Sequence, residues 1–165
     1  MADTTGAATG QRRTERLELR VPTSPTQLPA VRAMAADLAL RMDFDLDAVE
    51  DLRLAVDEAC ATLSAVALAD QPLTVVFEVS HEGLRIDAWV PTAAPGVDVA
   101  RDGFGWAVLH TLVDTVEAGP RTQAGVPAGD GSDSPVAGIA LVKQLPQYST
   151  SSAIAGLADD LTVAP

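Results

Sequence analysis

The stretch Asp45–Ala67 constrains this chain most, because its apolar residues recur at spacings of three and four, the period of an α-helix. Asp45 is the predicted N-cap of this helix, and further acids follow it near the positive end of the helix dipole. One apolar stripe is predicted to pack into the core; it consists of Val49, Leu52, Val56, Ala59, Leu63 and Val66.

Two other faces of the predicted helix differ in character. The face that we expect to meet water carries Glu50, Arg53, Asp57 and Ser64. Between it and the core stripe runs a small, mostly apolar strip, made of Leu54, Ala55, Glu58, Ala61, Thr62 and Ala65. A carboxylate among alanines is either the floor of a pocket or an ordinary, partly exposed acid, and both interpretations of Glu58 stay open.

The composition limits the fold and the classes of partner. A chain of 165 residues with 47% hydrophobic but only 4% aromatic residues predicts one domain with an aliphatic core. The net charge of -12 argues against nucleic-acid binding, which needs clustered Lys and Arg, and favours a basic protein partner or simple solubility. With neither a signal-peptide pattern nor an apolar run long enough to cross a bilayer, we expect a cytoplasmic protein without membrane contact.

The chain has a single cysteine, Cys60, which excludes an internal disulfide and a multi-cysteine metal site. We expect Cys60 to be a small core residue, with a reactive thiol as the alternative. Apart from magnesium held with a nucleotide, discussed below, we expect no metal, because Cys and His do not occur at ligand spacing.

The remaining patterns predict one folded domain over residues 14–146, between a flexible segment, 1–13, and a disordered tail, 147–165. The predicted strands are Glu15–Val21, Leu73–Ser80, Leu84–Val90, Leu112–Ala118 and Val136–Leu145. Two further helices are predicted, one ending near Arg41 and one over Phe104–Val113, and a flexible loop over Pro120–Pro135. This order favours an α/β (α+β) two-layer sandwich, with a mixed or antiparallel sheet and helices on one face.

This order of elements, with the segments LRLAVDEACATL (Leu52–Leu63) and DGFGWAVLHTLVDTVE (Asp102–Glu117), resembles a known family. From about Glu15 to Leu145 the chain is similar to anti-sigma factors of the RsbW type, in the histidine-kinase-like (GHKL) ATPase superfamily. The resemblance implies a homodimer that regulates transcription in a stress response by binding a sigma factor and keeping it from RNA polymerase. An anti-sigma factor antagonist would then release the sigma factor. The surface that contacts sigma should involve the first helix, around Arg20 to Arg41.

Many members of this family also use ATP and magnesium to phosphorylate a serine of the antagonist. Carried over to this chain, the catalytic glutamate is Glu58, and Thr62 stands where the family has an asparagine that helps to hold magnesium. Gly103 and Gly105 match the glycine turn that offers backbone N–H groups to phosphate at a helix start.

Three departures from the family pattern predict a degenerate nucleotide site. Thr62 offers magnesium a shorter hydroxyl instead of an amide. The aspartate that accepts a hydrogen bond from adenine is missing after the second hairpin strand, where Thr92 is the only nearby side chain with an oxygen. An unpaired buried polar group costs about 1–3 kcal/mol. The six residues between Gly96 and Gly103 are too few for the family's flexible lid.

We therefore expect an anti-sigma factor that is not an efficient kinase. The alternative is an active ATP-dependent serine/threonine-protein kinase, with Glu58 as base and magnesium-ATP at Thr62 and Gly103–Gly105. A third possibility is a dimeric scaffold without either activity. Several interpretations stay open: Gly103 and Gly105 as phosphate cradle or plain helix start, and Trp89 and Trp106 as pocket lining or core. The acidic cluster Asp43, Asp45, Asp47, Glu50 and Asp51 is either a solvated helix start or part of a sigma-binding surface.

Overall fold

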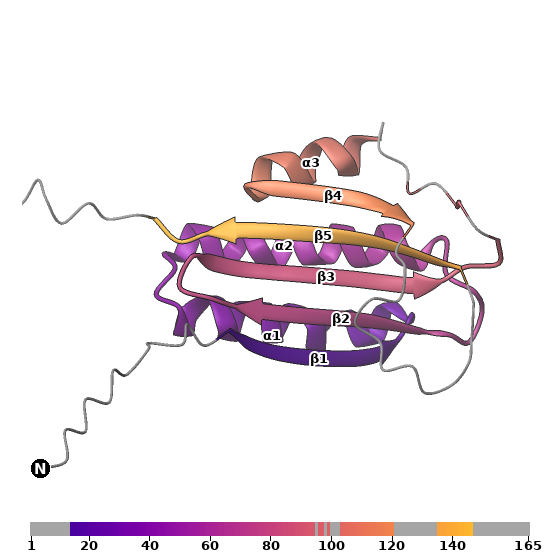
Figure 1. The fold of residues 1–165 in the computed structure, drawn as a ribbon, viewed down its shortest axis with the longest axis horizontal. Coiled ribbons are helices and arrows are strands. Elements are labelled where there is room, and N and C mark those ends of the chain that lie inside the picture. Colours follow the sequence, from indigo (N-terminus) through magenta and orange to yellow (C-terminus); the bar gives the residue numbers. More distant parts are fainter. Residues whose placement is uncertain (1–13, 95, 98, 100–102, 121–134, 147–165) are drawn as a thin grey trace, which may run out of the picture.

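The computed structural model describes residues 14–94, 96–97, 99, 103–120 and 135–146. They form two layers, with an antiparallel five-stranded sheet in order β1-β2-β3-β5-β4 and helices α1 and α2 across one face of it (Figure 1). The strands are β1 (Glu15–Pro22), β2 (Pro72–Val79), β3 (Gly83–Pro91), β4 (Thr115–Pro120) and β5 (Val136–Gln144). The predicted two-layer α/β sandwich with helices on one face is therefore confirmed, and its sheet is antiparallel.

The core lies between the sheet and the helices because alternate residues of each strand point to the helical side. In the central strands, Phe77 lies opposite Leu17 of β1 and Ile86 of β3, and Ile86 lies opposite Leu141 of β5. Phe77 and Ile86 are buried, as the aliphatic composition predicts for most of this cluster.

Three α-helices complete the described part. A short 3-10 turn, η1 (Pro25–Gln27), leads into α1 (Leu28–Arg41), which α2 (Leu46–Ser64) follows after a brief loop. The shorter α3 (Phe104–Leu112) packs against α2 beside the edge strand β4. Within the described ranges, no helix combines the length and the apolar content that a membrane span requires.

The central helix agrees with its prediction in most respects. Asp45 is the N-cap, because its Oδ1 accepts a hydrogen bond of 2.8 Å from the backbone N–H of Ala48. The predicted core stripe is buried apart from its last residue, Val66, which is half-buried. The placement of Ala55 on a half-covered strip was wrong, since Ala55 is fully buried. The helix also ends at Ser64, three residues before the predicted end.

The start of the fourth strand also differs from its predicted position, for a local reason. The fourth strand begins at Thr115 and not at Leu112, because the backbone N–H of Val113 still bonds to the Leu109 carbonyl and closes α3. The flexible segment 1–13 and the tail 147–165 lie outside the described residues. The same holds for most of the predicted Pro120–Pro135 loop.

Candidate functional site at the α2–α3 seam

One lysine holds α3 in place along α2. Lys143 of β5 donates a hydrogen bond of 2.7 Å from Nζ to the carbonyl of Leu112, at the end of α3. The same Nζ lies 3.2 Å from Asp51 Oδ2 on α2. Lys143 is the only lysine in the chain, and no sequence motif includes it. Its contacts depend on the pairing of strands far apart in sequence, so no local pattern could have revealed them.

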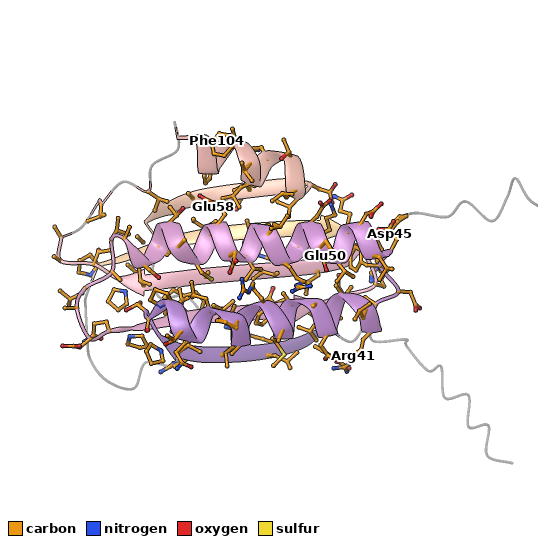
Figure 2. All side chains as sticks on the ribbon, turned by 180° about the vertical axis from the view of Figure 1, so that it is seen from behind. Arg41, Asp45, Glu50, Glu58 and Phe104 are labelled. Atoms are coloured by element: carbon orange, nitrogen blue, oxygen red, sulfur yellow. The ribbon has the colours of Figure 1, made fainter. Side chains whose placement is uncertain are left out.

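At the other end of the seam, Glu58 meets Gly105. A Cβ added to Gly105 would overlap Glu58 Oε1 and would lie 2.7 Å from Glu58 Cδ, so the Glu58 carboxylate occupies the space beside α3 that a side chain at residue 105 would take. Figure 2 shows Glu58 on α2 near Phe104, the first residue of α3. Glu58 is half-buried, and its carboxylate lies by the first turn of α3, where the helix dipole favours a negative charge.

The two glycines of the predicted turn therefore differ. Gly103 is the N-cap of α3 with φ -84°, and an added Cβ would meet no heavy atom within 4 Å. Neither backbone strain nor a close neighbour requires glycine there. At Gly105, by contrast, an added Cβ would displace the Glu58 carboxylate, which is the end of a flexible side chain. The structure thus brings Glu58 and Gly105 together.

A double-mutant cycle measures this contact. Gly105→Ala alone should change the free energy of unfolding little, because better helix propensity, about 1 kcal/mol, offsets the displacement of Glu58 from the helix start. In a Glu58→Ala background the displacement vanishes, and Gly105→Ala should stabilise the protein by about 0.5–1 kcal/mol. Urea unfolding of the four variants measures the coupling, and strictly additive effects would contradict the contact.

Thr62 lies one turn after Glu58 on α2 and is half-buried. Its hydroxyl forms no hydrogen bond with another residue of the described ranges. Those ranges also contain no group of three His, Cys, Asp or Glu side chains placed to hold a metal ion. Any magnesium here would therefore depend on few protein oxygens, with Thr62 one of them.

Thr92, the candidate substitute for the missing adenine-binding aspartate, is almost fully buried. Its hydroxyl lies within donating distance of two carbonyl oxygens, 3.0 Å from Ala94 and 3.1 Å from Pro135. Its backbone N–H also bonds to the Pro135 carbonyl at 2.8 Å. Thr92 thus joins the end of β3 to the residue that precedes β5.

The two tryptophans do not share a site. Ala88 and Val90 of β3 belong to the core on the helical side, so the alternation of side chains along a strand places Trp89 on the opposite face of the sheet. Trp106 of α3 packs against the core, and His110 approaches its ring edge-on, with 5.3 Å between the ring centroids. Of the two open interpretations, the structure supports core packing for Trp106 and not a pocket lined by both tryptophans.

Cys60 is buried in the core of α2, as expected for a small core residue. Burial, with a smaller contribution from the charge of Asp57, raises the pKa of its thiol to about 12. The reactive thiolate is therefore scarce near neutral pH, and a nucleophilic role for Cys60 is unsupported.

Most acids at the start of α2 have local partners or local tasks. Asp45 caps the helix, Asp51 pairs with Lys143, and Glu50 lies 2.6 Å from Arg53 Nη1. Asp43 adopts φ 60° in the loop before α2, a conformation that Asp tolerates better than most residues. These local partners agree with a solvated helix start, whereas a role of the cluster in binding sigma stays a prediction, with Asp47 exposed beside the paired acids.

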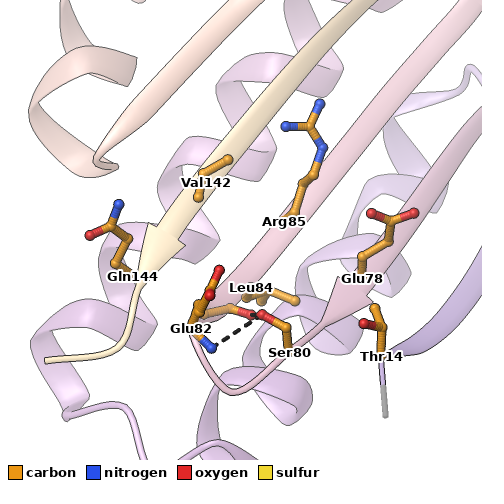
Figure 3. A pocket seen from close by; sticks show the side chains of 9 residues that line it. Thr14, Glu78, Ser80, Glu82, Leu84, Arg85, Val142 and Gln144 are labelled. Carbon is orange, nitrogen blue, oxygen red and sulfur yellow. Dashed lines mark hydrogen bonds between the residues drawn. The ribbon is translucent and has the colours of Figure 1, made fainter. Parts of the chain in front are cut away.

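A hollow of about 580 Å³ lies against the turn between β2 and β3 (Figure 3). Within the hairpin, the backbone N–H of Glu82 donates to Ser80 Oγ at 3.2 Å. Arg85 donates two hydrogen bonds to Asp87, at 2.7 and 3.0 Å, and these bonds raise the pKa of Arg85 above its ordinary value. Ser80 and Arg85 of the hollow therefore already have partners within the hairpin.

Comparisons with known proteins agree with this geometry. Residues 21–126 match the histidine kinase-like ATPase domain family. The chain is 36% identical over 118 residues to the anti-sigma-F factor RsbW of Mycobacterium tuberculosis, covering 71% of this chain and 70% of the relative. It is 31% identical over 124 residues to a serine-protein kinase RsbW of Bacillus cereus, and the match covers 64% of this chain and 78% of the relative. The chain therefore belongs to the histidine kinase-like ATPase domain family and is a relative of the RsbW proteins.

Proposed function

We propose that this protein is an anti-sigma factor that binds a sigma factor, keeps it from RNA polymerase and yields it to an antagonist protein, without using ATP. The observation that carries the second half of this proposal is the burial of Thr92, which is 3% exposed with its hydroxyl against the backbone carbonyls of Ala94 and Pro135. The first half is supported by the relationship to RsbW proteins, of which the Mycobacterium tuberculosis relative is named an anti-sigma-F factor.

The burial of Thr92 argues against adenine recognition. The family's aspartate accepts a hydrogen bond from the adenine amino group, and the Thr92 oxygen could accept one as well only if the amino group could reach it, because its own hydrogen points to the carbonyl of Ala94 or Pro135. The side chain is also 3% exposed, so it presents almost no surface to a ligand. An adenine amino group buried here without a partner would weaken binding by about 1–3 kcal/mol.

The residues expected to hold phosphate support the same conclusion. The Glu58 carboxylate lies against Gly105, in the first turn of α3, where a phosphate would need the free backbone N–H groups. A phosphate placed there would meet a like charge in a partly buried position. Thr62 would add a single hydroxyl for magnesium. These residues therefore fit a nucleotide poorly.

An active kinase remains a second candidate, because Glu58 is half-buried at the helix start, where the family's catalytic glutamate is expected. In that case Glu58 would be the base that accepts the proton of the antagonist's serine hydroxyl. Thr62 and the turn Gly103–Gly105 would hold magnesium-ATP. The Bacillus cereus relative is named a serine-protein kinase.

Isothermal titration with magnesium-ATP separates the two candidates. The proposed function predicts no binding in the micromolar range, and a heat signal that is the same for the wild type and for Glu58→Ala. Micromolar, magnesium-dependent binding that Glu58→Ala abolishes would establish the nucleotide site and favour the kinase. Cys60→Ser is a control for general damage to α2, because it alters the same helix on its core side.

Sigma binding and assembly are tested on the full chain. We propose that it is a homodimer of the cytoplasm, as the resemblance implies. A tagged chain should retain a sigma subunit from lysate of its source, identified by mass spectrometry, and light scattering should give the mass of two 17.1 kDa chains. If no sigma subunit is retained, the anti-sigma proposal fails.

A further inference from the structure

Two large apolar side chains are exposed on either side of Glu58. Phe104, the first residue of α3, is 87% exposed, and Leu54, one helical turn before Glu58 on α2, is 56% exposed. Phe104 lies near Glu58, because it precedes Gly105, beside which the Glu58 carboxylate lies, and Leu54 lies one turn from Glu58 along α2. Burying a side chain of this size in an interface would stabilise a complex, whereas leaving it in water brings no benefit to the monomer.

Leu54 and Glu58 continue an acidic stripe along α2. Asp47, Asp51, Leu54 and Glu58 are spaced by four, three and four residues, so they lie along one side of the helix. Lys143 ties Asp51 and the end of α3 together, and Glu58 meets the start of α3, which sets α3 alongside the stripe. We name these four residues and Phe104 the seam surface.

The charge of the seam surface selects its partner. Asp51 is paired with Lys143, but Asp47 and Glu58 form no ion pair with a described residue. Two uncompensated carboxylates beside Leu54 and Phe104 repel nucleic acid and anionic lipid, and they attract a segment that is both basic and apolar. A helix with apolar residues at positions i, i+3, i+4 and i+7 and Lys or Arg beside them matches both properties.

We propose that the seam surface binds a basic amphipathic helix of a protein partner, and that on the proposed function this helix belongs to the bound sigma factor. Leu54 and Phe104 contact its apolar face, and Asp47 and Glu58 pair with its basic side chains. This surface differs from the region around Arg20–Arg41 that the family resemblance implied.

The first experiment uses a probe that does not depend on the sigma factor. It is a fluorescein-labelled 14-residue peptide of leucine and lysine in the i, i+3, i+4, i+7 pattern, titrated by fluorescence anisotropy. Leu54→Ser and Phe104→Ser should each raise Kd at least tenfold. Leu40→Ser on α1 is the matched control, because Leu40 is 52% exposed, and it should change Kd less than twofold.

Charge is tested separately. The double variant Asp47→Asn/Glu58→Gln should raise Kd about tenfold and flatten its dependence on salt, whereas neutralising Glu15, an exposed acid of β1, should do neither. A peptide with glutamate in place of lysine should not bind. Equal effects of the seam and control variants, or binding of the acidic peptide, would overturn the proposal.

The second experiment measures retention of the sigma subunit by the same variants in a pull-down. Loss with Leu54→Ser and Phe104→Ser but not with Leu40→Ser supports the proposal. Retention by the seam variants together with loss by Leu40→Ser overturns it and leaves the anti-sigma function standing. If the wild type retains no sigma subunit but binds the basic peptide through the seam, the proposed function fails and the docking surface stands. If the protein is a dimer and the seam variants dissociate it, the surface contacts a second copy of the chain, and the proposal is overturned.

Discussion

Replacing Phe77 by alanine is expected to lower the free energy of unfolding by about 3–5 kcal/mol. Phe77 is fully buried on the helical side of β2, opposite Leu17 and Ile86 in the neighbouring strands. Few aromatic residues contribute to this core, so the cavity left by the ring would be lined by aliphatic side chains that relax only in part. Urea unfolding followed by circular dichroism measures the change.

Leu46→Ala is the control, because Leu46 is 73% exposed at the start of α2 and should change stability by less than about 0.5 kcal/mol. If Phe77→Ala is too unstable to purify, Phe77→Leu, which leaves a smaller cavity, provides a measurable intermediate loss. A Phe77→Ala variant as stable as Leu46→Ala would contradict the position of Phe77 in the core.

Gly83→Ala is expected to cost about 3 kcal/mol of stability, at the upper end of ordinary single substitutions. Gly83 begins β3 with φ +156°, a backbone conformation that other residues adopt only under strain. An added Cβ would overlap the carbonyl oxygen of Lys143 and would lie 2.9 Å from the Cα of Gln144. Both neighbours are backbone atoms of β5, so no side-chain rotation relieves the clash.

The matched control for Gly83→Ala is Gly119→Ala in the edge strand β4, where an added Cβ meets nothing within 4 Å. That variant should be neutral or slightly stabilising, because alanine restricts the unfolded chain more than glycine does. Thermal unfolding compares the two. If both substitutions had the same effect, the close approach of β3 and β5 at residue 83 would be refuted.

The sequence predicted the local features of this protein well. The α2 stripe follows from a spacing of three and four, and the Asp45 cap follows from a hydrogen bond that spans three residues. The strand positions followed from alternation and from turn residues such as Gly83. The family resemblance rested on the same local patterns and is confirmed by the match over residues 21–126.

Features that depend on contacts between distant elements could not be predicted in this way. Ala55 is buried although it lies beside Leu54 and Glu58 on the predicted strip, and nothing in the α2 sequence specifies which elements pack against that side. For the same reason the sequence left open whether Trp89 and Trp106 line one pocket, and the alternation along β3 places Trp89 on the face of the sheet away from the core.

In the candidate site, too, some features follow from the local sequence and others from contacts between distant elements. The sequence by itself determined the chain's layered fold, its family and the identity of Glu58, Thr62, Gly103 and Gly105 as the residues to examine. Only the tertiary structure decided that Gly105 makes room for Glu58, that Thr92 bonds to the strand end, and that Phe104 stays exposed. Local spacing fixes which residues share one face of one element, whereas the contacts of that face depend on elements brought to it by the whole fold.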